Sequence, residues 1–160
     1  MSRLHRLLVC FSLPAVALAQ SLHVPLSTTD RKTPGVLSLI LDAPPGKAPS
    51  AMQWEISVPP AIVIGKGDIS IGKAAEMARK TLTCAVSANK AAAPQGVRYL
   101  CILAGGQDPI GSGTIAMVRY RAQADVQGAP IRVAIEKILG VSADLKRIEI
   151  PNAYAIINIR

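Results

Sequence analysis

Aromatic and histidine side chains are scarce in this sequence. Its 160 residues include one Trp, three Tyr, one Phe and two His. A groove for single-stranded nucleic acid needs stacked rings along a track of cations. The formal charge of +8 comes from Lys and Arg scattered singly, such as Lys32, Lys47 and Arg132, and not interleaved with aromatics expected at the surface. We therefore expect no nucleic acid partner in spite of the basic balance.

Long apolar runs are also missing after the N-terminus, where a membrane span would need about 18 such residues. The first residues carry Arg3 and Arg6, followed by the apolar LLVCFSLPAV and the small-residue site Ala17–Ala19. This order is typical of a secretory signal peptide, 1–19, with cleavage after Ala19. We expect one secreted domain over 20–160, extracellular or periplasmic, with no transmembrane segment.

Cysteine is limited to three residues, of which Cys10 lies in the predicted leader. Cys84 and Cys101 lie in the apolar segments TLTCAV and VRYLCIL, which the turn-rich ANKAAAPQG separates. Two cysteines in an exported chain most often pair, and no His or further Cys is nearby to make a metal or thiol site. We predict a Cys84–Cys101 disulfide between two strands of an antiparallel hairpin.

The stretch GDISIGKA, 67–74, has the G-x-x-x-x-G-K spacing of a phosphate-binding loop. Ala74 stands where such a loop needs a Ser or Thr hydroxyl for magnesium. The β-branched Ile69 and Ile71 resist the positive φ angles of a phosphate cradle. We expect no nucleotide site.

A different structure is predicted for this stretch. The glycines favour a turn at Gly65–Gly67, a short strand through Ile69 and Ile71, and a second turn at Gly72. Lys73 would then lie in solvent. The helix formers of AAEMARK leave open whether 73–80 is helical.

No arrangement of catalytic residues stands out. His23 is the only histidine after the leader, so it has no partner for a triad or a metal cluster. The ten acidic residues are dispersed, and a pair such as Glu55 with Asp108 is not distinguished by its spacing from surface acids. We predict no catalytic residue, no metal and no cofactor, and a small secreted enzyme is the third of our interpretations.

Short apolar segments separated by Pro, Gly, Asn and Asp fill the rest of the chain, and several alternate with a period of two. In Met52–Val58, for example, Met52, Trp54, Ile56 and Val58 share one face. Ten candidate strands are Leu22–Leu26, Val36–Leu41, Met52–Val58, Ala61–Ile64, Leu82–Val86, Val97–Leu103, Thr114–Ala122, Ile131–Ile135, Ile148–Ile150 and Ala153–Ile159. We predict an all-β, mostly antiparallel sandwich with at most one or two short helical segments. Residues 136–147 also fit a helical spacing and stay open.

Three stretches resemble cohesin-like domains. SAMQWEISVPPAIVIGKGDISIGKAA resembles their early strands, IGSGTIAMVRYRA resembles a Gly followed by an alternating core strand, and IEIPNAYAIINI is similar to their closing strands. The resemblance covers Leu22 to Arg160 and implies a jelly-roll sandwich of about nine strands. It also implies a non-catalytic binding or assembly module with a dockerin-like protein partner in a polysaccharide-related or cell-surface assembly. No binding motif matches, so the ligand-binding residues are unknown.

The runner-up on the same fold is a carbohydrate-binding module, which would bind polysaccharide through exposed rings. Trp54, Tyr99 and Tyr120 fall on faces assigned to the core, and only Tyr154 has no assigned face. This distribution favours a protein partner over direct sugar binding.

Overall fold

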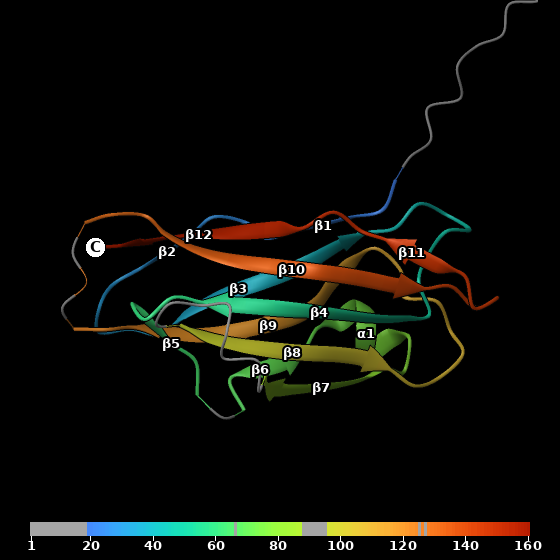
Figure 1. Cartoon of the computed structure of the whole chain (residues 1–160), viewed down its shortest axis with the longest axis horizontal. Coiled ribbons are helices and arrows are strands. Elements are labelled where there is room, and N and C mark those ends of the chain that lie inside the picture. The colour runs from blue at the N-terminus through green and yellow to red at the C-terminus, as the bar shows by residue number, and fades with distance from the viewer. Residues whose placement is uncertain (1–18, 66, 88–95, 125, 127) are drawn as a thin grey trace, which may run out of the picture.

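The computed structural model describes residues 19–65, 67–87, 96–124, 126 and 128–160. They form two β-sheets that pack face to face (Figure 1). One short helix lies in the connection that leads from the smaller sheet to an edge strand of the larger sheet. The predicted all-β sandwich is confirmed, with twelve strands in place of about nine. The elements are β1 (Ser21–His23), β2 (Ser27–Thr29), β3 (Gly35–Asp42), β4 (Ala51–Val58), β5 (Ile62–Val63), β6 (Ile69–Ile71), α1 (Lys73–Met77), β7 (Thr81–Val86), β8 (Val97–Ala104), β9 (Gly113–Ala122), β10 (Ile131–Val141), β11 (Arg147–Glu149) and β12 (Ala153–Ile159).

The strand order brings distant segments together. One sheet runs β2-β12-β10-β4-β8-β7, with β11 paired to β10, and the other runs β1-β3-β9-β5, with β6 paired to β9. The β2–β12 pair is parallel and the other pairs are antiparallel. The centre of the larger sheet is therefore β10-β4-β8, three strands that come from three separate parts of the chain.

The predicted first strand, Leu22–Leu26, is wrong as a single element. The chain crosses between sheets here, because β1 pairs with β3 and β2 pairs with β12. Pro25 lies between β1 and β2 and has no N–H to give to a ladder, so pairing stops there. The Ser-Thr-Thr of β2 has no apolar alternation and was not predicted.

The helical spacing in 131–147 comes from a β-bulge. The β10–β4 register shifts between Glu136 and Leu139, and Lys137 has a φ of 51°. The extra residue changes which positions point inward, so Ile135 and Ile138 are both buried although three positions separate them. Residues 136–141 are thus strand, and 73–77 form α1.

The core lies between the sheets and follows the predicted alternation. Trp54 and Tyr120 are completely buried, and Tyr99 is half-buried. Gly35 lies under the Tyr120 ring, since a Cβ at position 35 would overlap the ring atoms. The Tyr120 hydroxyl shares a 2.8 Å hydrogen bond with Ser27 Oγ, which joins β9 to β2 across the two sheets. A tyrosine is therefore accommodated in the core by a glycine and a hydroxyl partner.

The short strand predicted within GDISIGKA is present, whereas Gly72 has an extended backbone before α1 in place of the predicted second turn. Gly67 has a φ of 86°, Ile69–Ile71 is β6, and Gly72 packs so closely on the Thr114 carbonyl that no Cβ would fit. Lys73 begins α1 and is exposed, 3.9 Å from Glu76. The two glycines serve backbone geometry in this segment.

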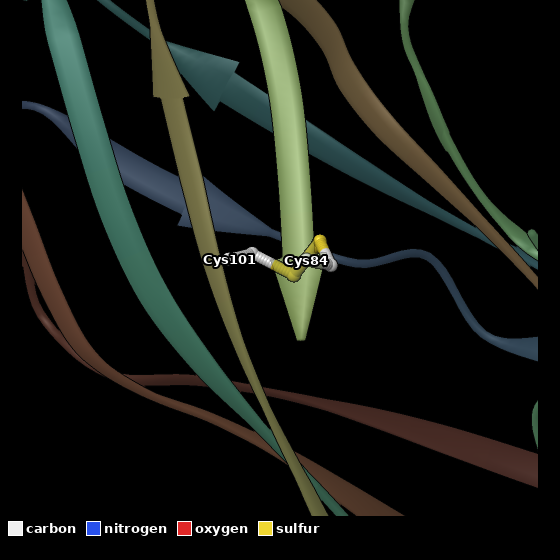
Figure 2. Close-up of a disulfide and its surroundings, with 2 residues drawn as sticks. All are labelled: Cys84 and Cys101. Atoms are coloured by element: carbon white, nitrogen blue, oxygen red, sulfur yellow. A yellow bond between two sulfur atoms is a disulfide. The ribbon is translucent and has the colours of Figure 1, made fainter. Parts of the chain in front are cut away.

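The two cysteines form a disulfide between neighbouring strands. Cys84 of β7 lies opposite Cys101 of β8, with Cα atoms 4.1 Å apart (Figure 2). Cys101 is buried in the core, whereas Cys84 is half-buried near the edge. The bond fixes the last strand of the larger sheet to its neighbour.

Two further sequence predictions concern the signal peptide and the absence of a transmembrane segment, and the described residues cover each of them only in part. The predicted signal peptide, 1–19, lies outside the described residues except for Ala19. Within the described part of the chain, no helix is long and apolar enough to cross a membrane.

Candidate binding face

The outer face of β10-β4-β8 combines charged and apolar side chains. On β4, Gln53, Glu55 and Ser57 alternate with the buried Met52, Trp54 and Ile56, so they point to solvent. Each has a neighbour on β8 in register: Gln53 pairs with Ile102, Glu55 with Leu100, and Ser57 with Arg98. On the other side, Glu55 lies opposite Glu136 of β10. This face is continuous across three hydrogen-bonded strands.

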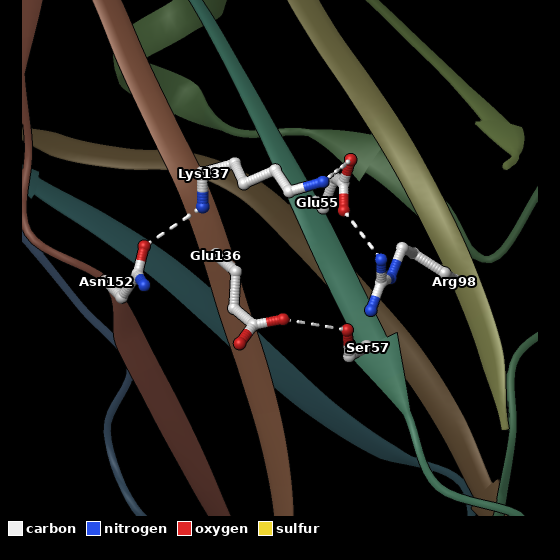
Figure 3. Close-up of polar contacts among 6 residues, drawn as sticks. All are labelled: Glu55, Ser57, Arg98, Glu136, Lys137 and Asn152. Carbon is white, nitrogen blue, oxygen red and sulfur yellow. Dashed lines mark hydrogen bonds and ion pairs between the residues drawn. The ribbon is translucent and has the colours of Figure 1, made fainter. Parts of the chain in front are cut away.

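A network of ion pairs holds Glu55 (Figure 3). Its Oε2 lies 3.3 Å from Arg98 Nη1, and its Oε1 lies 3.0 Å from Lys137 Nζ. The side chains of Glu55 and Arg98 are each only 13% exposed. Because both side chains are largely removed from water, solvent screens the Glu55–Arg98 attraction less than that of an ordinary surface ion pair.

Glu136 has a separate partner. Ser57 Oγ donates a 3.1 Å hydrogen bond to Glu136 Oε2 (Figure 3). The two glutamates are cross-strand neighbours, an arrangement that repels unless cations intervene. Arg98 and Lys137 supply these cations next to Glu55.

The bulge places Lys137 where it can reach Glu55. Its backbone N–H donates a 3.0 Å hydrogen bond to Asn152 Oδ1, just before β12. A lysine with positive φ is unusual, and this side-chain acceptor satisfies the N–H that the bulge removes from the ladder. The bulge therefore contributes directly to the charge arrangement of the face.

Apolar side chains lie next to the network. Leu100 is 37% exposed and Ile102 is 45% exposed, and both are direct neighbours of β4 residues. Further along the sheet, Tyr154 of β12 is 53% exposed, with the Arg132 guanidinium 4.3 Å from its ring centre. Exposed apolar groups beside fixed charges are typical of protein interfaces.

The other residues weighed in the sequence lie elsewhere. His23 is on the edge strand β1, with Nδ1 3.2 Å from Asp42. Asp108 lies in the β8–β9 connection and its carboxylate is 3.7 Å from Arg79. Glu55 and Asp108 thus have different ionic partners, and the structure does not bring them together as a pair.

Groups of three or more His, Cys, Asp or Glu side chains able to hold a metal ion are absent from the residues that the structure describes. The buried Lys80 donates to the carbonyl oxygens of Gly105 and Gly106, at 2.6 and 3.0 Å. Burial lowers the pKa of Lys80, and the nearby Asp108 opposes this shift. Lys80 therefore fixes the turn after β8.

Sequence reasoning did not identify Arg98, Leu100 and Ile102 as surface residues of interest. The sequence VRYLCIL could have indicated these residues. Its strand has Tyr99, Cys101 and Leu103 on one face, and the apolar Leu100 and Ile102 on the other. A strand that is apolar on both faces is typical of a sheet covered on both sides, so in a two-layer sandwich it indicates apolar side chains on the outer face. That these residues lie next to Glu55 could be learned only from the strand order, which places β8 beside β4.

The sheets define the class of protein as an all-β jelly-roll sandwich, and comparison with solved structures makes the class more specific. A non-cellulosomal cohesin from Archaeoglobus fulgidus is similar, with a TM-score of 0.64, 10% identity, and coverage of 87% of this chain and 91% of that chain. The sixth cohesin of Acetivibrio cellulolyticus scaffoldin B, solved with a Cel5 dockerin, has a TM-score of 0.67 and 9% identity over 89% and 99%. The cohesin module of a Clostridium perfringens family 33 glycoside hydrolase has a TM-score of 0.59 and 12% identity over 89% and 97%.

The chain has the fold of a cohesin-like domain, as the sequence resemblance predicted. No protein-family model matches the chain, and no curated protein matches it. At identities of 9–12%, the similarity concerns the fold.

Proposed function

We propose that this chain is a non-catalytic binding module of cohesin type that binds a dockerin-like protein on the outer face of β10-β4-β8. The observation that carries the proposal is the exposed Leu100 and Ile102 beside the ion-paired Glu55. A small apolar area can supply most of the binding energy, and neighbouring fixed charges select the partner. Because these side chains lie on a sheet, the apolar area and the charges can bind a partner without a change in the backbone.

A protein partner is supported by neighbours of the same fold that were solved with dockerins, including a Clostridium thermocellum OlpA cohesin. The non-catalytic assignment is supported by the fold, which this chain shares with cohesins. Secretion, and a role in a cell-surface or polysaccharide-related assembly, depend on the predicted signal peptide at 1–19.

Direct polysaccharide binding has less support. Sugar rings stack on exposed, coplanar aromatic rings, but of the four aromatic residues after the leader only Tyr154 is exposed. The guanidinium of Arg132 lies over that ring and competes for its face. Polysaccharide is therefore kept as an alternative outcome of the experiment.

The experiment immobilises the mature chain and exposes it to culture supernatant from the organism that encodes it. In parallel, the free chain is mixed with insoluble polysaccharide and sedimented. We expect retention of a specific protein, and no sedimentation with polysaccharide. Sedimentation with polysaccharide and no retained protein would contradict the proposal in favour of the carbohydrate-binding alternative.

A further inference from the structure

Strand β7 is a long and open edge of the larger sheet. It has six residues, and among the described residues it pairs only with β8, whereas the edge elements β1, β2, β5 and β6 have two or three residues each. Its sequence, TLTCAV, contains no charge and no proline. Charges, prolines and short length are the features that prevent edge strands from pairing with another chain. β7 has none of these protections.

The register identifies the backbone groups that are open on this edge. Cys84 and Cys101 have Cα atoms 4.1 Å apart, the short separation of an antiparallel pair that does not exchange hydrogen bonds. Ser87 N–H donates to the Arg98 carbonyl, so the bonded positions are the odd-numbered ones. Leu82, Cys84 and Val86 consequently direct their N–H and C=O groups away from β8. Within the described residues, no hydrogen bond to these groups is found.

The same three residues line a groove. A cavity of about 580 Å³ lies between β7 and the segment formed by Gly65, Gly67 and Ile69, with Tyr99 also in its lining. Val86 is 64% exposed here, at the rim. A strand added to β7 would therefore satisfy the open backbone groups and place its alternate side chains in this groove.

We propose that the added strand is β7 of a second copy of this chain. The incoming strand must have uncharged, apolar residues on the groove side, and its outer side faces solvent. β7 itself meets this requirement, with Leu82, Cys84 and Val86 on one face and Thr81, Thr83 and Ala85 on the other. Two-fold pairing places Cys84 opposite its own copy and Leu82 opposite Val86 of the second copy. It forms about six backbone hydrogen bonds, two for each facing pair.

This pairing has a consequence for binding. The two-fold axis of a continuous antiparallel sheet is perpendicular to the sheet, so both outer β10-β4-β8 faces point to the same side. The dimer would present two binding faces to one assembly. Once one face is bound, the second face would bind at a raised effective concentration, which increases the overall avidity. The pairing itself does not depend on the proposed function of that face.

The test measures the mass in solution by sedimentation over about a hundredfold range of concentration, because the dimer fraction rises with concentration by mass action. Two double variants place charges on the exposed outer side, where Thr83 faces Ala85 of the second copy. The variant Thr83→Lys/Ala85→Lys creates facing lysines, and the matched control Thr83→Lys/Ala85→Glu creates facing opposite charges. Both keep the β7–β8 bonds and the side chains of Leu82, Cys84 and Val86, whereas Thr83 also borders the cavity. We expect a dimer for the wild type and for Lys/Glu, and a monomer for Lys/Lys.

Amide hydrogen exchange adds a residue-specific readout. In the monomer, the amides of Thr83 and Ala85 are protected by β8, and those of Leu82, Cys84 and Val86 exchange quickly. Dimerisation should protect the second group as concentration rises. A wild type that is monomeric at every concentration, or a dimer that the Lys/Lys variant does not weaken, would overturn the proposal. Protection of Leu82, Cys84 and Val86 in a monomer would also overturn it, since another segment would then cover the edge.

Discussion

Glu55 and Glu136 lie directly opposite each other on neighbouring strands, and their charges are balanced by different groups. Glu55 is held between Arg98 and Lys137, whereas Glu136 accepts a hydrogen bond from Ser57. The two carboxylates therefore differ in their contribution to stability, although their positions on the sheet are equivalent.

Glu55→Gln should lower the free energy of unfolding by about 1–2 kcal/mol, because it leaves Arg98 largely buried without its counter-ion. Glu136→Gln should change it by less than about 0.5 kcal/mol, since the amide oxygen can still accept the Ser57 hydrogen bond and the repulsion with Glu55 is removed. Urea unfolding of both variants at neutral pH measures the difference. Equal losses would show that the network does not distinguish the two acids.

Gly35→Ala should be strongly destabilising, by about 3 kcal/mol or more, because its Cβ would overlap the buried Tyr120 ring. The matched control is Gly111→Ala, where no atom lies within 4 Å of the new Cβ. Thermal unfolding of the two variants gives the comparison. A Gly35→Ala variant as stable as the control would mean that Tyr120 packs differently.

Several of these relationships could be predicted from the sequence and others could not. The alternation around Trp54 predicted β4 and its buried face, and turn residues predicted β6 and the turn before it. The bulge at Lys137 could not be predicted, because a lysine with positive φ depends on the Asn152 side chain fifteen positions later. The Glu55–Arg98 pair depends on β8 being next to β4, which local periodicity does not determine.

The disulfide should be present in protein produced in an oxidising compartment. Intact mass should rise by two hydrogens on reduction, and alkylation before reduction should label no thiol. Reduction should lower the free energy of unfolding by about 3 kcal/mol, the effect of opening a loop with a sequence separation of 17. A Cys84→Ser/Cys101→Ala variant serves as the control, since its stability should not respond to reductant. Two free thiols in the untreated protein would contradict the prediction.

Stability should fall in alkaline solution. Burial, with a smaller effect of Asp68, raises the pKa of Tyr99, whose hydroxyl donates a 2.9 Å hydrogen bond to the Ile64 carbonyl. Burial also raises the pKa of Tyr120, and its hydrogen bond with Ser27 opposes the shift. Since the folded pKa values exceed the unfolded ones, this contribution is complete below about pH 10 and is lost as pH rises through the folded values.

Tyr99→Phe should reduce that alkaline loss relative to the wild type, because one proton fewer is held by the folded state. Urea unfolding at pH 8 and at intervals above pH 10 measures the slope. The idea fails if the Tyr99→Phe and wild-type slopes are the same.

The most direct test of the binding face compares two double variants for retention of the partner protein. Leu100→Lys/Ile102→Lys changes the outer face of β8, and the control Val36→Lys/Met117→Lys changes two similarly exposed apolar residues on the opposite sheet. Circular dichroism first establishes that both are folded. The account predicts that the β8 variant loses binding at least about a hundredfold while the control binds like the wild type. Binding that is lost in the control and kept in the β8 variant would contradict it.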